Sequence, residues 1–340
     1  MAEQTEACMK LFSLLSILLL IFASCRETDD RPEYIFRLGH QANERDIWHL
    51  SALHFAKALD SLSSGRIEVR VHPAEQLGPE LDMIRSIRAG IVEMTITGES
   101  MQNWAGITAL LAVPYLIRDS EHLKQVVEGE IGDEIADEMI RKIGLRPIGY
   151  FERGPRHLTS NRPITAPADL GGMILRVPNV PLFVKVWQAL GAKPTPMTFS
   201  EVFTALQQGT VEAQENPYAL VYSAGLFEVQ KYLNLTKHVT SWIYVVIGEK
   251  QFRNLPHDLQ EKVLEAGKLM QQYHEREFVK QEMFLRQQLE NRGMIFNEPD
   301  LEAFRQKAEA AVLDALPEEY RSLYRKITEL GKATETDETD

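Results

Sequence analysis

Residues 173–217 constrain the fold of this chain more than any other stretch. They predict, in one run, a strand, a helix, a short strand, a second helix and a final strand. The two predicted helices, 181–190 and 200–208, are short and amphipathic. Arg176 lies at the end of the first hydrophobic strand and Asn216 at the end of the last. Because ligand groups lie at the carboxyl ends of strands in open α/β sheets, these two side chains are candidates for a binding site.

Strands and helices alternate through the rest of the chain, which predicts βαβ units around a mostly parallel sheet. A chain of 340 residues favours two domains over a single core. The apolar run 242–248 is long enough for a strand buried on both faces, and the helical pattern 256–291 is long enough to span two domains. The remaining predicted strands are 34–39, 66–71, 91–97, 146–150 and 294–296, and the remaining helices are 48–64, 80–88, 121–143 and 300–330.

The N-terminus predicts an export signal. Residues 11–22 form an apolar run of signal-peptide length that is short for a membrane span. The following Ala23-Ser24-Cys25 resembles a bacterial lipobox, in which the cysteine is lipidated and becomes the mature N-terminus. Acidic residues precede Met9, and a start at Met9 would give Met-Lys and then the apolar run. We therefore expect a signal peptide over 1–24, with translation beginning at Met1 or Met9.

Composition narrows the class of protein. A net charge of −12 disfavours nucleic acid or an anionic membrane as a binding partner. Both cysteines, Cys8 and Cys25, lie in the leader, so the mature body has no disulfide, metal thiolate or thiol nucleophile. The common nucleotide, hydrolase and zinc-protease motifs are absent from the sequence, and the nine histidines are scattered. Together with export and two domains, this favours a binding protein without a cofactor or metal over an enzyme.

An ordered series of short motifs carries a family resemblance. The series is Ser64-Gly65-Arg66-Ile67, Gln76-Leu77-Gly78, Val113-Pro114-Tyr115-Leu116, the run Arg156 to Arg162 (RHLTSNR), Asp169-Leu170-Gly171-Gly172, Leu175-Arg176-Val177-Pro178, Met197-Thr198-Phe199-Ser200-Glu201 and Gln214-Glu215-Asn216-Pro217. In this order the motifs resemble the solute receptors of tripartite ATP-independent periplasmic (TRAP) transporters over about residues 34–325. The resemblance implies a two-lobed clam-shell of the periplasmic-binding-protein type (type II), with hinge strands and a long helix spanning both domains.

The resemblance also implies ligand-binding residues in the second lobe. The arginine of Leu-Arg-Val-Pro, Arg176, would hold the ligand carboxylate, which suits the planar fork of a guanidinium. Arg156 would reach the carboxylate or a hydroxyl; its alternative is an ion pair with Glu152 or Asp169. Asn216 would donate and accept hydrogen bonds at once, although an asparagine before proline is also common in turns. Phe199 would pack on the ligand, or belong to the core.

The first lobe is expected to supply the opposite wall. Gln41 and His40 follow the first predicted strand, Glu80 begins a helix, and Glu99 follows the third strand. Carboxylates accept hydrogen bonds from hydroxyls and repel a second carboxylate, so Glu80 and Glu99 favour a polyhydroxylated monoacid. Solvated helix or loop ends are the alternative for both. Sialic-acid receptors of the family carry an arginine where this chain has Gln102, which favours smaller sugar acids such as uronates or aldonates.

These observations predict an extracytoplasmic receptor, periplasmic or held at the cell surface by a lipid on Cys25. We expect a monomer that delivers a small organic acid to integral-membrane TRAP subunits. A receptor for C4-dicarboxylates or keto acids, a receptor of another transport or sensor system, and a secreted α/β enzyme using Glu80 and Glu99 on sugar acids are the alternatives. The expected divisions are a linker at 25–33, lobe I at 34–153 plus about 242–281, lobe II at 154–241 plus about 282–330, and a disordered tail at 331–340.

Overall fold

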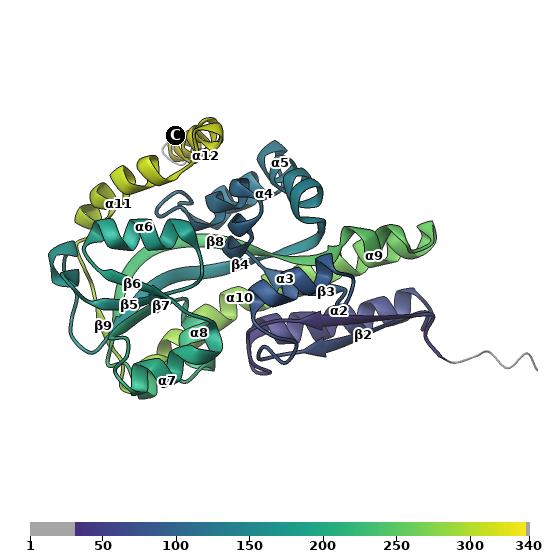
Figure 1. The fold of residues 1–340 in the computed structure, drawn as a ribbon, viewed down its shortest axis with the longest axis horizontal. Helices are drawn as coiled ribbons and strands as arrows, with labels where there is room; N and C mark the ends of the chain where they lie inside the picture. The colour runs from purple at the N-terminus through teal and green to yellow at the C-terminus, as the bar shows by residue number, and fades with distance from the viewer. Residues whose placement is uncertain (1–30, 338–340) are drawn as a thin grey trace, which may run out of the picture.

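The structure, a computed structural model, describes residues 31–337 (Figure 1). Its framework is a nine-stranded sheet in the order β2-β1-β3-β8-β4-β7-β5-β6, with β9 paired to β8. The strands are β1 (Tyr34–Gly39), β2 (Ile67–His72), β3 (Met94–Thr97), β4 (Leu145–Ser160), β5 (Ile174–Val177), β6 (Lys193–Pro196), β7 (Ala213–Asn216), β8 (Tyr232–Gly248) and β9 (Ile295–Asn297).

Two long antiparallel strands, β4 and β8, join two lobes. The first lobe contains β1, β2 and β3, and β3 pairs with the carboxyl-terminal end of β8. The second lobe contains β5, β6 and β7, and β7 pairs with residues 157–160 of β4. The β4–β8 register shifts between Arg153 and Arg156 and again between Arg156 and Leu158, where the strands pass from one lobe to the other. Such bulges bend a strand locally, so they place the hinge beside these two arginines.

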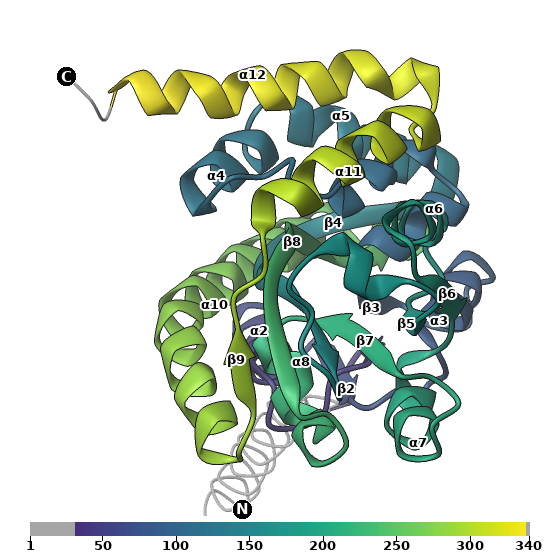
Figure 2. The same ribbon diagram turned by 90° about the vertical axis from the view of Figure 1, so that its left-hand side faces the viewer.

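Helices cover both faces of the sheet. They are α2 (Ile47–Leu62), α3 (Glu80–Arg88), α4 (Ser120–Val127), α5 (Glu130–Glu138), α6 (Pro181–Leu190), α7 (Val202–Gln207), α8 (Tyr218–Ser223), α9 (Glu249–Arg253), α10 (His257–Asn291), α11 (Leu301–Ala315) and α12 (Arg321–Asp337). The long helix α10 packs on α2 of the first lobe, on the hinge strand β4 and on α8 of the second lobe, and Figure 2 shows it curving along one side of the molecule. No helix between residues 31 and 337 is both long and apolar enough to cross a membrane.

Successive side chains of β8 point to opposite faces of the sheet, and both faces are covered by helices, which explains the continuous apolar sequence of this strand. Trp242 and Tyr244 enter the core on the face covered by α6 and α11, whereas Ile243 and Val245 enter the core beneath α2 and α10. A third core lies between α7, α8 and the end of α10 in the second lobe. Because successive strand residues point to opposite faces, a strand with helices on both sides must be apolar throughout.

The structure confirms the two-lobed α/β clam-shell with hinge strands and a long spanning helix, and it corrects several details. Most strand pairings are parallel, as predicted, but the sheet is mixed, because β8 runs antiparallel to β3 and β4, and β4 runs antiparallel to β7. The predicted helix 121–143 is divided at Gly129, whose extended backbone separates α4 from α5. Helix α12 continues to Asp337, into the segment 331–340 that was expected to be a disordered tail. The leader, with Cys25, lies outside the described residues.

Candidate functional site

Two small cavities share Gln41 and Glu80 in their walls; the first lies where the lobes meet, and the second lies in the first lobe beside Arg153. The first encloses about 30 Å³, and its lining includes Glu75, Arg176 and Phe199 as well as Gln41 and Glu80. The second encloses about 10 Å³ and is lined by Gln41, Trp48, Glu80, Ile96, Thr97, Gly98, Glu99, Arg153 and Ile243. Both therefore combine side chains from strand ends with charged groups of both signs, as small-molecule sites do.

Larger hollows occur elsewhere on the described surface. One of about 430 Å³ lies between the loop 43–46, α8 and α10, and another of about 450 Å³ lies over the hinge beside α11. Neither is lined by Arg176 or Glu80. Convergence of buried polar groups, and not size, therefore marks the candidate site.

Arg176 is a buried cation at the end of β5. Its side chain is 3% exposed, and its Nε and Nη2 donate to the carbonyl oxygen of Met197 at 3.1 and 2.6 Å. The guanidinium carbon lies 5.9 Å from the centre of the Phe199 ring. Burial lowers the pKa of Arg176 to about 10 against the raising effect of Glu215, so the group stays charged at neutral pH. Within residues 31–337 it forms no ion pair with a carboxylate, which leaves its charge available for an anion.

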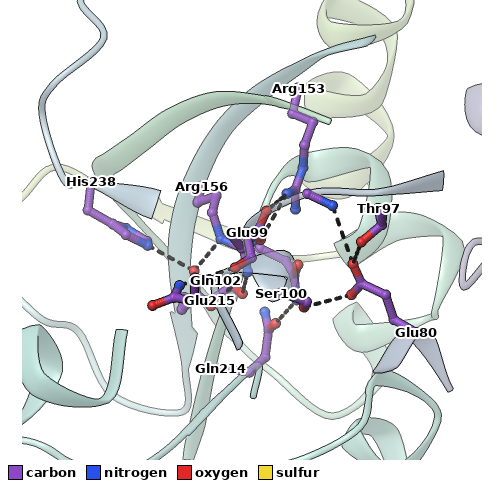
Figure 3. Close-up of polar contacts among 12 residues, drawn as sticks. Glu80, Thr97, Glu99, Ser100, Gln102, Arg153, Arg156, Gln214, Glu215 and His238 are labelled. Carbon is purple, nitrogen blue, oxygen red and sulfur yellow. Dashed lines mark hydrogen bonds and ion pairs between the residues drawn. The ribbon is translucent and has the colours of Figure 1, made fainter. Parts of the chain in front are cut away.

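Arg156, by contrast, is held in a buried network at the hinge (Figure 3). Its Nη2 donates to Glu215 Oε1 at 2.7 Å, and its Nη1 lies 3.3 Å from Glu99 Oε1. Arg153 donates from Nη1 to both oxygens of Glu99, at 2.7 and 2.9 Å. His238 Nε2 lies 2.9 Å from Glu215 Oε2. Two cations and two carboxylates thus balance one another at the point where β4 and β8 change lobes.

Hydrogen bonding and burial together define the protonation of this network. His238 Nδ1 lies 2.8 Å from the Thr236 hydroxyl, so the hydroxyl can donate to Nδ1 while Nε2–H donates to Glu215. Burial lowers the pKa of His238, which keeps the imidazole neutral at pH 7. Burial by itself would raise the pKa of Glu215, but Arg156 and the hydrogen bonds outweigh burial and lower it to about 2. Glu215 is therefore ionised throughout the physiological range.

The alternation of β7 separates two groups of polar residues. Asn216 Nδ2 donates to Gln214 Oε1 at 2.6 Å, and Gln214 Nε2 donates to Thr159 Oγ1 at 2.9 Å. Gln214 is the register partner of Arg176 in β5. Paired residues of neighbouring strands point to the same face of the sheet, and so do residues two apart in one strand. Gln214 and Asn216 therefore lie on the same face as Arg176. Glu215 lies on the opposite face, where it contacts Arg156.

Glu80 and Gln41 of the first lobe border both cavities. Glu80 accepts hydrogen bonds from Thr97 Oγ1 at 2.5 Å and Ser100 Oγ at 2.9 Å. Burial and the charge of Glu99 raise the pKa of Glu80. Glu99 lines the second cavity, where both of its oxygens already accept from Arg153. Glu80 Oε1 also accepts from the Gly98 backbone N–H at 3.3 Å, so the oxygens of both carboxylates already have donors in the protein.

The structure does not bring every predicted residue to a cavity wall. Of the predicted residues, Gln41, Glu80, Glu99, Arg176 and Phe199 line the two cavities, whereas His40, Gln102, Arg156 and Asn216 do not. His40 is fully buried with its Nε2 3.1 Å from His49 Nδ1, and burial lowers its pKa to about 3. Gln102 bridges the lobes: its Oε1 accepts from the backbone N–H of Leu182 at 3.1 Å, at the start of α6.

The suggested ion-pair partners of Arg156, Glu152 and Asp169, are wrong. Glu152 accepts instead from Ser120 Oγ at 2.5 Å, and Asp169 accepts from Thr165. The sequence reasoning also missed Arg153 and Glu215. A signal for Glu215 was present, because a charged residue between Gln214 and Asn216 in a buried strand requires a charged partner. No group of three His, Cys, Asp or Glu side chains in residues 31–337 is placed to hold a metal ion.

The fold and the cavity define a two-lobed binding protein, and comparison with known proteins gives its family. Residues 38–321 match the family of bacterial extracellular solute-binding proteins, family 7. A solute-binding protein of Roseobacter denitrificans is 51% identical over 295 residues, covering 87% of this chain and 91% of that protein. The crystal structure of this TRAP periplasmic solute-binding protein, with L-galactonate bound, has a TM-score of 0.86 and covers 87% of this chain and 99% of the other.

Two further relatives extend the comparison. The 2,3-diketo-L-gulonate-binding periplasmic protein YiaO of Escherichia coli is 34% identical over 263 residues, covering 76% of this chain and 79% of that protein. A TRAP periplasmic solute-binding protein of Bradyrhizobium, solved with galacturonate, is 30% identical with a TM-score of 0.83, covering 86% of this chain and 99% of that one. The chain therefore belongs to family 7, the solute-binding receptors of TRAP transporters, which are not enzymes.

Proposed function

We propose that this protein is the extracytoplasmic receptor for a small sugar acid, an aldonate or a uronate, and that Arg176 binds the ligand carboxylate. The observation that carries the proposal is a buried guanidinium without a carboxylate partner in the described chain, lining the same cavity as Glu80. A buried charge is stable only when it is paired, and a ligand carboxylate would complete the pair. The sugar acids bound to the Roseobacter and Bradyrhizobium relatives support the same class.

The two sides of the cavity assign the ligand a direction. The carboxylate would face Arg176 with Phe199 packed beside it, and the hydroxyls would face Glu80 and Gln41. Burial is the main cause that lowers the pKa of Arg176, and Glu215 opposes it. The positive charge of Arg156 lowers this pKa further, so the two guanidiniums repel each other. An anion near both would relieve this repulsion. We therefore propose that Asn216 borders the carboxylate subsite on the face of Arg176, and that Arg156 acts on the ligand carboxylate through its charge from the other face of the sheet.

The acidic groups of the first lobe favour this ligand class over a C4-dicarboxylate. Glu75 and Glu80 line the cavity of Arg176 and would repel a second carboxylate on the ligand. A keto acid with few hydroxyls would offer no donor to the buried Oε2 of Glu75, which has no hydrogen-bond partner among the described residues, and this is costly in a closed site. A monoacid with several hydroxyls satisfies both sides of the cavity.

A thermal-shift panel tests the proposed function. We expect L-galactonate, D-galacturonate or a related sugar acid to raise the melting temperature, because a ligand at a hundred times its dissociation constant adds about 2.7 kcal/mol of stability. Succinate and pyruvate should produce much smaller shifts. A response to dicarboxylates alone, or to none of these acids, would contradict the proposal.

Gln102 is expected to stabilise the closed arrangement of the lobes. Helix α6 has no side-chain cap of its own, and Gln102 from the first lobe accepts from the N–H of Leu182 at its start. A second contact joins the lobes nearby, from Asn103 Nδ2 to the Asn179 carbonyl at 3.0 Å. Because one such hydrogen bond contributes about 1 kcal/mol, Gln102→Ala should weaken ligand binding roughly fivefold.

Titration calorimetry of Gln102→Ala would measure this loss, with Gln125→Ala, at a partly exposed position on α4 away from both cavities, as the control. The weaker affinity should come from faster release of the ligand, since the cavity walls are unchanged. An unaltered dissociation rate would show that this bridge does not contribute to closure.

We further propose that the protein works outside the cytoplasm with integral-membrane TRAP subunits, as a monomer that closes by a hinge motion of lobe I (34–153 plus about 242–281) on lobe II (154–241 plus about 282–330). Export by the 1–24 signal and lipidation of Cys25 are part of this proposal. Mass spectrometry of the N-terminus of the membrane-associated protein would test it, with Cys25→Ala as the control. A soluble product without a lipid would contradict the anchor.

A further inference from the structure

We propose that Glu75 is a specificity-determining residue that accepts a hydrogen bond from a ligand hydroxyl and excludes acids carrying a second carboxylate. This inference rests on the proposed sugar-acid site. Glu75 lies in the turn between β2 and α3, outside every motif that carried the family resemblance, and it lines the cavity of Arg176.

The backbone holds Glu75 in an uncommon conformation. Ala74 and Glu75 have φ angles of 51° and 58°, two successive non-glycine residues in the left-handed region. Such conformations cost free energy and persist where the surrounding structure imposes them, often at ligand sites. Here the turn is bound to the loop after β1: Ala74 N–H donates to the Ala42 carbonyl at 2.8 Å, and Glu75 N–H donates to the His40 carbonyl at 3.1 Å.

The carboxylate of Glu75 has an unused acceptor. Its Oε2 is buried and has no hydrogen-bond partner among the described residues, unlike the oxygens of Glu80, which accept from Thr97 and Ser100. Buried polar atoms nearly always have partners, so an orphaned oxygen in a ligand cavity indicates a missing donor. An ionised carboxylate only accepts, and therefore the matching ligand group is a hydroxyl.

The negative charge of Glu75 would also exclude ligands that carry a second carboxylate. Glu75 is one of the carboxylates that interact electrostatically with Arg176, yet the two form no ion pair. A ligand with its carboxylate on Arg176 and a hydroxyl toward Glu75 satisfies both groups. A dicarboxylate would place a negative charge against Glu75 in a poorly hydrated cavity, where like charges repel strongly.

Titration calorimetry with L-galactonate, a set of its monodeoxy analogues and succinate tests this role. Glu75→Gln should weaken L-galactonate binding about tenfold or more, since hydrogen bonds to charged groups are among the stronger ones. The same variant should narrow the preference for L-galactonate over succinate. For one monodeoxy analogue, the wild type and Glu75→Gln should bind equally, because the hydroxyl that Glu75 contacts is absent. A merely structural role would weaken every analogue by the same factor.

Two further variants complete the design. Glu44→Gln removes the same charge from an exposed position outside the two cavities and should leave all affinities unchanged. Glu75→Asp keeps the charge but shortens the reach, so it should weaken L-galactonate while still rejecting succinate; it also serves if Glu75→Gln does not fold. Wild-type affinities in Glu75→Gln would overturn this inference and leave the proposed function intact. A wild type that binds no sugar acid would overturn both.

Discussion

Arg176→Lys is expected to weaken binding of the sugar acid by about two decades. A lysine retains the charge, but its ammonium cannot present two parallel donors to a carboxylate as a guanidinium does. Losing a partner of a buried charged pair costs about 3–5 kcal/mol, which corresponds to roughly two to three decades in affinity. Titration calorimetry of the variant against the wild type measures the loss directly.

The control for this experiment is Arg162→Lys, which changes an exposed arginine in the loop after β4. It should bind with wild-type affinity. The ligand-free Arg176→Lys protein should lose only about 1 kcal/mol of stability, because Arg176 forms no ion pair within residues 31–337 and a lysine can still donate to the Met197 carbonyl. Unchanged affinity in Arg176→Lys would remove this residue from the binding site.

The second large effect is expected on stability. Glu215→Gln removes one of two carboxylates that balance Arg153 and Arg156, and it leaves the two buried cations to share Glu99. Breaking such a pair costs about 3–5 kcal/mol. For a chain of this length the melting temperature should fall on the order of 5 °C. Urea unfolding at pH 7 would give the free energy, with Glu68→Gln, in an exposed pair with Arg70, as a near-neutral control.

The same carboxylate predicts a pH dependence. The pKa of Glu215 falls from 4.5 to about 2 on folding, so its contribution to stability is present above pH 4.5 and is lost as the pH falls toward 2. The shift corresponds to about 3 kcal/mol. The difference between wild type and Glu215→Gln should therefore shrink on going from pH 7 to pH 3. A constant difference across this range would show that the ionised carboxylate is not what stabilises the hinge.

Local pattern predicted most of the fold. Alternation, glycine stops and apolar periodicity located β1, α2 and α10 closely, because each of these elements is specified by its own residues. The same reasoning shortened β4 and β8, taking 146–150 and 242–248 for strands that extend over 145–160 and 232–248. Their missing halves contain polar residues such as Arg156 and His238, whose burial depends on partners far away in the chain.

The candidate site divides in the same way. The type of residue at a strand end predicted Arg176, Glu80 and Gln41 at the cavity, since strand direction brings such ends together. The local sequence did not predict that Arg156 forms an ion pair with Glu215, because the two residues are 59 positions apart in the chain. Glu75 was also missed, since an orphaned oxygen is a property of the folded environment and leaves no mark in the local sequence.

The sequence by itself determined the two-lobed α/β architecture and the family, and it singled out Arg176 as the candidate for binding the acid, because periodicity and short ordered motifs are properties of the local sequence. Only the tertiary structure decided which charges neutralise one another and which remain for a ligand. Arg153, Arg156, Glu99 and Glu215 pair within the hinge, and Arg176 does not share that network. The physical reason is that pairing depends on distance and burial across the sheet, which chain order does not specify.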